Sequence, residues 1–138
     1  MRSLRRVVIL AATVNLLLGC APTGLESQVN GTVKLDGKAV GPGTITFALK
    51  NASSNPATGA IEKDGSYRLK TARTAGLHPG MYQVSLTVFE AAQGQPGKRL
   101  YGPSKMITPE KYSSTGTSGL EYEVKSGGNT INIDLSSK

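Results

Sequence analysis

Apolar and polar residues alternate along much of the chain beyond residue 28. In the first alternating segment, Val29, Val33 and Leu35 are separated by polar residues, and Gly31 takes the remaining apolar position. A period of two sends successive side chains to opposite faces of an extended chain, so each segment has one apolar and one polar face. The pattern predicts seven β-strands, over residues 29–35, 45–50, 58–62, 66–70, 82–88, 120–125 and 131–135.

Pairs of residues that favour turns lie between these segments. They are Asp36-Gly37, Asp64-Gly65, Pro79-Gly80 and Gly127-Gly128, which accept positive φ or preset the first corner of a turn. No stretch after residue 20 shows a sustained helical period, so we predict an all-β domain, either a sandwich or a barrel. Residues 90–118 interrupt the rhythm, and connections of that length are often functional or disordered.

The first nineteen residues have the organisation of a cleavable export signal. Three arginines precede an apolar run over residues 7–18, which is followed by Gly19 and Cys20. A membrane-spanning helix needs about 20 apolar residues, whereas this run is shorter and is interrupted by Asn15. We therefore expect the run to be removed as a signal peptide, residues 1–19, rather than kept as a transmembrane anchor.

The residues around Cys20 resemble the lipobox of bacterial lipoproteins, with Leu17, Leu18 and Gly19 before the cysteine. The resemblance implies that the Cys20 thiol receives a diacylglycerol, that residues 20–27 form a lipidated tether, and that the exported protein is anchored to the bacterial cell envelope. Acyl chains hold a small domain on a bilayer because each buried methylene contributes about 0.8 kcal/mol. Alternatives are a free thiol beside an ordinary cleavage site or a core segment, and Arg5-Arg6 leaves the twin-arginine export route open.

The charge of the chain is partly a property of this signal. Lys and Arg number 16 and Asp and Glu number 9, but removal of residues 1–19 takes three cations and no acid, which leaves a net charge of +4. The remaining cations form no stripe with interleaved aromatic rings, so we expect no nucleic-acid partner. A single cysteine allows no internal disulfide, and the core must rest on aliphatic side chains because Trp is absent.

The order of the segments resembles small bacterial lipoproteins with a carboxypeptidase regulatory-like, or transthyretin-like, domain. The resemblance implies a seven-stranded Greek-key β-sandwich over residues 28–138 that serves as an accessory or interaction module. It brings no catalytic or ligand-binding residues with it. The matching stretches are residues 29–40, 43–47, 59–69, 76–84, 108–112, 118–124 and 129–135.

The chain offers few residues for catalysis or metal binding. His78 is the only histidine, whereas a nucleophile needs an oriented base and a zinc site needs several nitrogen or sulfur ligands. Glu121 and Glu123 share one strand face, and the alternation makes that the solvated face. Asp36 and Asp64 are read as turn residues rather than calcium ligands. We therefore expect no enzyme activity, no cofactor and no metal site.

The irregular segment is the best candidate for contact with a partner. It mixes cations with aromatic rings that suit an anionic polymer or a protein. The alternative is that Tyr112 and Ile107 fold back over an open edge or end of the sandwich, with the lysines solvated. The candidate residues are Lys98, Arg99, Tyr101, Lys105, Lys111 and Tyr112.

Two functions are compatible with these observations. The first is a membrane-anchored, non-catalytic binding module that engages an unknown protein or a surface polysaccharide. The second is a structural envelope component that assembles through the edges of the sandwich. A hydrolase is disfavoured because only His78 could serve as an imidazole base.

Overall fold

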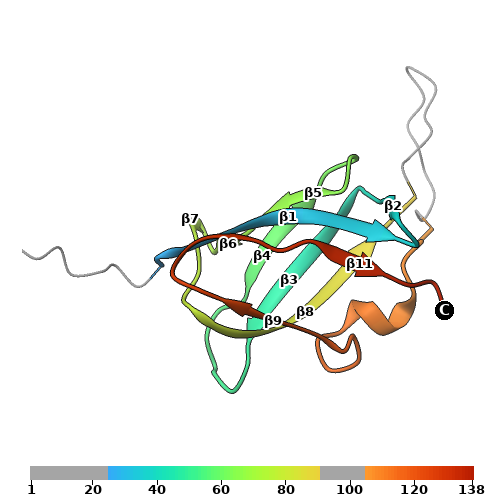
Figure 1. Ribbon diagram of the computed structural model, residues 1–138. Helices are drawn as coiled ribbons and strands as arrows, with labels where there is room; N and C mark the ends of the chain where they lie inside the picture. The colour runs from blue at the N-terminus through green and yellow to red at the C-terminus, as the bar shows by residue number, and fades with distance from the viewer. Residues whose placement is uncertain (1–24, 91–104) are drawn as a thin grey trace, which may run out of the picture.

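The computed structural model describes residues 25–90 and 105–138, and the predicted signal peptide and Cys20 lie outside them. The described part is all-β, as expected, with one short 3-10 helix and no α-helix (Figure 1). None of its helices is long and apolar enough to cross a membrane. The elements are β1 (Ser27–Leu35), β2 (Lys38–Ala39), β3 (Gly43–Leu49), β4 (Ala57–Ile61), β5 (Ser66–Arg68), β6 (Lys70–Thr71), β7 (Thr74–Ala75), β8 (Gly80–Val88), η1 (Glu110–Ser113), β9 (Leu120–Val124), β10 (Gly127–Thr130) and β11 (Ile133–Leu135).

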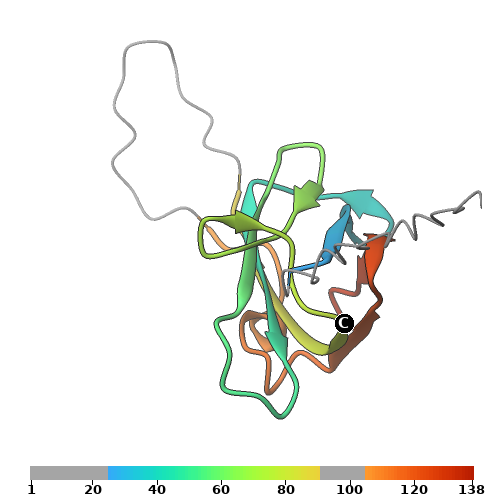
Figure 2. The same cartoon turned by 90° about the vertical axis from the view of Figure 1, so that its left-hand side faces the viewer.

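The strands form one strongly curled sheet that wraps around the core as a half-barrel (Figure 2). Its order is β10-β1-β5-β4-β3-β8-β9, and β11 also pairs with β1. One residue pair, Ile61 with Tyr67, joins β4 to β5, and two more pairs join β4 to β6, which follows β5 after Leu69. This sparse junction divides the sheet into an antiparallel group (β4, β3, β8 and β9) and a terminal group (β5, β1, β10 and β11).

The antiparallel group follows the predicted alternation closely. β3 and β8 pair over seven residues, from Gly43 opposite Val88 to Leu49 opposite Tyr82. Apolar side chains on these strands point inward, and Phe47 at the centre of β3 is fully buried. Its ring lies 6.0 Å from the ring of Tyr82 and 6.4 Å from that of Tyr67, so it contacts both groups.

The terminal group is built on β1, which pairs in parallel with β10 and β11 from the end of the chain. Gly31 is essential to this arrangement because a Cβ added there would overlap the carbonyl oxygen of Ile131. The Tyr67 hydroxyl donates a hydrogen bond of 2.7 Å to the same carbonyl. The backbone at Ile131 therefore occupies the space that a side chain at position 31 would fill.

The predicted core is the observed core. Every predicted strand segment contains a strand, and the seven segments supply nearly all of the fully buried apolar side chains. The start of β1 falls at Ser27, a buried residue that also bridges to Leu77, one residue before the predicted domain boundary at residue 28.

The turn predicted at Gly127-Gly128 is confirmed only in part. Gly127 has a positive φ of 92°, but both residues belong to β10, and the chain bends earlier, at Lys125 and Ser126. The Asn129 side chain causes this shift: its carbonyl oxygen accepts a hydrogen bond from the Lys125 backbone N–H (2.9 Å), and its amide donates to the Lys125 carbonyl (2.7 Å). The turns at Asp36-Gly37 and Asp64-Gly65 lie as predicted, and Asp36 and Gly37 both have positive φ, at 49° and 81°. At Pro79-Gly80 only Pro79 precedes the strand, because Gly80 is the first residue of β8.

Candidate functional site

A groove of about 870 Å³ lies on the outer face of the sheet, away from the core. It spans the junction between the two groups, over β1, β5, β4 and the start of β3. Because successive strand residues alternate between faces, the residues between the core positions of these strands form its floor and walls. The side chains that define it are Asn30, Thr32, Thr58, Ser66, Arg68 and Asn132.

Strand pairing arranges the groove side chains in rows across the terminal group. Asn30 on β1 lies between Thr130 on β10 and Arg68 on β5. Directly paired residues in a sheet place their Cβ atoms about 4.5–5.5 Å apart. One row therefore presents a hydroxyl, an amide and a guanidinium side by side.

A second row is held together by hydrogen bonds. Thr32 lies opposite Ser66, and the side-chain oxygen of Asn132 accepts hydrogen bonds of 3.1 Å from both the backbone N–H and the hydroxyl of Thr32. A backbone N–H can only donate, so the orientation of the Asn132 amide is determined. Its NH₂ group is directed away from Thr32 and forms no hydrogen bond with another of the residues that the structure describes.

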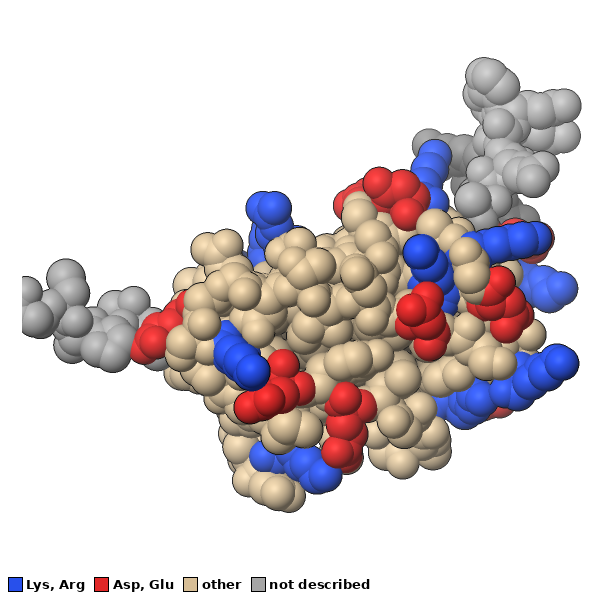
Figure 3. Space-filling model, in the orientation of Figure 1, with Lys and Arg blue, Asp and Glu red and all other residues tan. Residues whose placement is uncertain are grey.

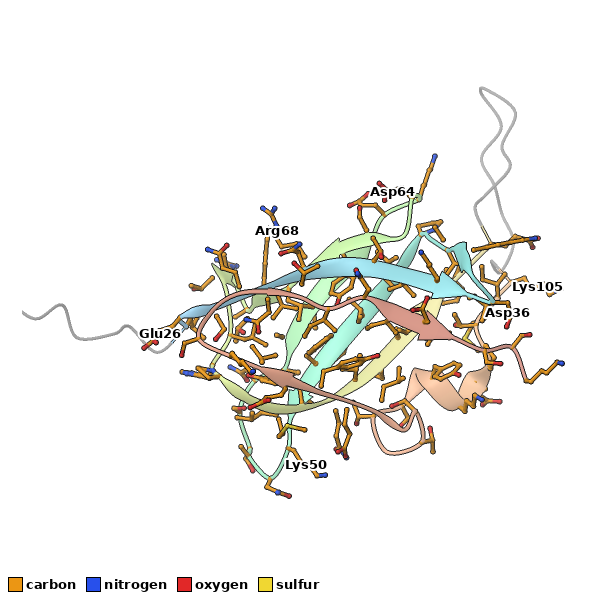
Figure 4. The ribbon with its side chains drawn as sticks, viewed as in Figure 1. Glu26, Asp36, Lys50, Asp64, Arg68 and Lys105 are labelled. Atoms are coloured by element: carbon orange, nitrogen blue, oxygen red, sulfur yellow. The ribbon has the colours of Figure 1, made fainter. Side chains whose placement is uncertain are left out.

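The charges in the groove are unevenly placed. Arg68 and Lys70 line one end, and Glu62 is the only acid among the lining residues. Among the described residues the single ion pair joins Lys50 to Glu121, at 2.8 Å, so neither groove cation is neutralised by a carboxylate. Figure 4 shows Arg68 standing out from the sheet, well separated from Asp64 and Lys50.

Neither His78 nor a cysteine is among the residues that line the groove, and no cluster of three metal-ligating side chains occurs in residues 25–90 or 105–138. Glu121, outside the groove, is exposed, and the hydrogen bond from the Lys50 ammonium lowers the pKa of its carboxyl. The Asp64 carboxylate accepts bonds from the Ser66 backbone and hydroxyl, which lower its pKa and hold the turn.

The partner-contact residues expected from the sequence lie elsewhere. Arg99, Tyr101 and Lys98 fall outside the described residues. Lys105 is exposed at the end of the domain opposite Glu26, where β1 begins, as the labels in Figure 4 show. Lys111 is also exposed, and its ammonium lies 4.9 Å from the centre of the Tyr112 ring.

Tyr112 is only 7% exposed and belongs to the core. Its hydroxyl hydrogen-bonds to the backbone of Ser136 at 3.3 Å, and Ile107 packs beside the same core. The ring is therefore not presented to a partner, and this part of the segment closes one end of the domain. For the described part of residues 90–118, this geometry agrees with the alternative prediction, that Tyr112 and Ile107 fold back over an end of the domain.

Sequence reasoning did not find the groove. The alternation predicts only that these side chains lie on the solvent-exposed face of their strands. It does not say which strands are neighbours, so it cannot show that the side chains form one groove. On the face seen in Figure 3, acidic and basic side chains are interspersed rather than gathered in one patch.

No family model, no curated protein and no solved structure matches this chain.

Proposed function

We propose that this protein is a lipid-anchored, non-catalytic binding module of the bacterial cell envelope, and that the outer groove is its binding surface. The lipobox-like sequence that ends at Cys20 supports the anchor. One observation carries the binding role: a large groove lined with hydrogen-bonding side chains crosses the sheet where no described segment covers it. Such a surface can hold a ligand without turning it over.

We further propose that the curled sheet is a variant of the seven-stranded Greek-key sandwich of transthyretin-like domains. The sparse junction between β4 and β5 supports this proposal, because it leaves two groups of strands that face each other across the core. The order within the groups, β10-β1-β5 and β4-β3-β8-β9, is compatible with two such sheets joined at one corner.

The alternative function is assembly of copies through sheet edges. Among the described strands β9 pairs only with β8, so its other edge is open. Glu121 and Glu123 are exposed on this strand, and antiparallel pairing of two β9 strands would bring their carboxylates together. Like charges opposite each other destabilise strand pairs, so we favour binding over assembly.

Photo-crosslinking in intact cells tests the binding role. We expect Thr58→benzoylphenylalanine, in the groove, to yield discrete adducts, because Thr58 is exposed on the floor of the binding surface. Glu123→benzoylphenylalanine is the matched control, since Glu123 is equally exposed but lies outside the groove. Adducts from Glu123 alone, or ladders of linked copies, would instead support assembly.

Replacement of Cys20 tests the anchor separately. Cys20→Ala removes the only thiol, so metabolic labelling with an acyl precursor should be lost and the protein should no longer fractionate with membranes. A variant that remains labelled and membrane-bound would contradict the lipidation proposal.

A further inference from the structure

We propose that the outer groove binds a polysaccharide that carries carboxylate groups, with Arg68 as the residue that receives a carboxylate. The inference deepens the proposed binding role and rests on it. It names the chemistry of the ligand from the donors, charges and shape of the groove.

The groove offers more donors than its own residues use. The Asn132 oxygen is occupied by two hydrogen bonds from Thr32, which leaves the Asn132 NH₂ group available. Arg68 adds a guanidinium that forms no ion pair with a described residue. The planar fork of an arginine matches both oxygens of a carboxylate, and such charge-assisted pairs are roughly twice as strong as neutral hydrogen bonds.

Hydroxyl groups supply the rest of the lining. Thr58 and Thr130 each bring a hydroxyl that can both donate and accept. The Ser66 hydroxyl already donates to the Asp64 carboxylate, so it can only accept. Sugar hydroxyls have the same double capacity, so a chain of sugar rings can exchange hydrogen bonds with this surface at several positions. The two rows of side chains, at Asn30 and at Thr32, lie two residues apart along β1, so the hydrogen-bonding groups extend along the groove.

The charges give the ligand a direction. Arg68 and Lys70 lie toward one end, whereas Glu62 lies toward the end formed by the β4–β5 turn. A carboxylate is attracted to the first end and repelled from the second. An acidic polysaccharide is therefore positioned lengthwise by its charged groups, which a neutral glycan would not be.

The lining disfavours a protein as the occupant. The hot spots of protein interfaces are buried aromatic and arginine anchors seated in well-packed pockets. Tyr67 is the only aromatic residue that lines the groove, and it is 4% exposed, with its hydroxyl bound to Ile131. An acidic peptide would find a cation here but no exposed aromatic side chain against which to pack.

A pair of matched probes tests the proposal with the full-length acylated protein in detergent micelles. The first is an oligogalacturonate, and the second is the same oligosaccharide with its carboxyl groups methyl-esterified. By titration calorimetry we expect the acid form to bind at least about tenfold more tightly, the factor that one charged hydrogen-bond pair contributes. Because the contact is exposed, added salt should weaken it.

Two substitutions should lower the affinity for oligogalacturonate without disturbing the fold. Arg68→Gln removes the cation and should reduce affinity about tenfold. Asn132→Asp keeps the oxygen that binds Thr32 but replaces the NH₂ donor with a negative charge, so it should also weaken binding. Lys38→Gln and Asn51→Asp are the matched controls, since both residues are exposed and lie outside the groove.

Several results would overturn the ligand assignment. Equal binding of the acid and the ester, unchanged affinity in both groove variants, or tighter binding of polyglutamate than of oligogalacturonate would each do so. Discrete Thr58 crosslinks combined with any of these results would retain the binding role while rejecting the acidic polysaccharide. Absence of groove crosslinks would instead reject the binding role itself.

Discussion

The two groups of strands hold the sheet together in different ways. In the antiparallel group, β3 lies between β4, which follows it in the chain, and β8, whose paired residues are 33 to 45 positions further along. Apolar side chains of these strands fill the core. In the terminal group, β1 pairs with segments about a hundred residues away, as in the bond from the Ile131 N–H to the Asn30 carbonyl. There Val33 and Ile133 also belong to the core, but two backbones approach closely at Gly31, and the buried Tyr67 hydroxyl donates a hydrogen bond to the Ile131 carbonyl.

This difference indicates what each group tolerates. The antiparallel group depends on side-chain volume, because large residues such as Phe47 fill the space between the two faces of the core. The terminal group depends on the absence of volume at Gly31, where Ile131 approaches. Truncation of a buried side chain should therefore destabilise the antiparallel group most. Addition of a side chain at Gly31 should destabilise the terminal group most.

The largest effect is expected from Phe47→Ala, in the antiparallel group. Phe47 is fully buried among apolar side chains. Its truncation leaves a cavity that the surrounding strands cannot fill. We expect the free energy of unfolding to fall by about 3–5 kcal/mol, as measured by urea denaturation. Phe47→Leu is the control, and its cost should be clearly smaller. A cost below about 1 kcal/mol for Phe47→Ala would show that the core is loosely packed.

Gly31→Ala should have the next largest effect, although it adds only one methyl group. The new Cβ would overlap the Ile131 carbonyl and press on the Tyr67 ring, so β1 and the C-terminal segment must separate. We expect a loss of about 3 kcal/mol, the upper end of the usual cost of overpacking. Gly128→Ala, in β10, is the control because nothing lies within 4 Å of its added Cβ. Equal stability of the two variants would contradict the close approach in the terminal group.

Tyr67→Phe should have the smallest effect, and this effect should depend on pH. Loss of the bond to Ile131 should cost about 1 kcal/mol at neutral pH. Burial raises the pKa of Tyr67, so the folded state keeps its phenol neutral while the unfolded state ionises near pH 10.

Above that pH the unfolded wild type binds fewer protons than the folded form, so the stability of the wild type falls as pH rises. The variant lacks this group, so the difference in unfolding free energy between the two proteins should shrink between pH 7 and about pH 10.5. Denaturant melts of both proteins at each pH measure the difference. A difference that grew with pH would contradict the burial of the neutral phenol.

The alternation predicts the buried side chains correctly because burial on a strand depends on local spacing. Ile45 and Phe47 face inward because residues two apart on a strand share a face, whatever the partner strands are. The turn at Asp36-Gly37 was equally local. The shift at Gly127-Gly128 has the opposite origin: a side-chain contact from Asn129 placed the bend two residues earlier, and no dipeptide preference reports such a contact.

The groove could not be predicted for a related reason. Arg68 and Asn30 are 38 positions apart along the chain, and only the pairing of β1 with β5 makes them neighbours. Asn132 reaches Thr32 from the other end of the chain. Tyr112 was a plausible surface residue from its basic surroundings, and only the packing of η1 shows that its ring is buried.

The sequence by itself determined that this protein is all-β, which side chains form its core, and where most of its turns lie. Those properties depend on the spacing of residues along one strand and on the conformational preferences of a few turn residues. The tertiary structure decided the curl of the sheet, the parallel pairing of the chain ends, and the groove across their junction. These depend on register between distant strands, which is set by the clearance at Gly31 and the contacts of Tyr67 and Asn132, and no local pattern records it.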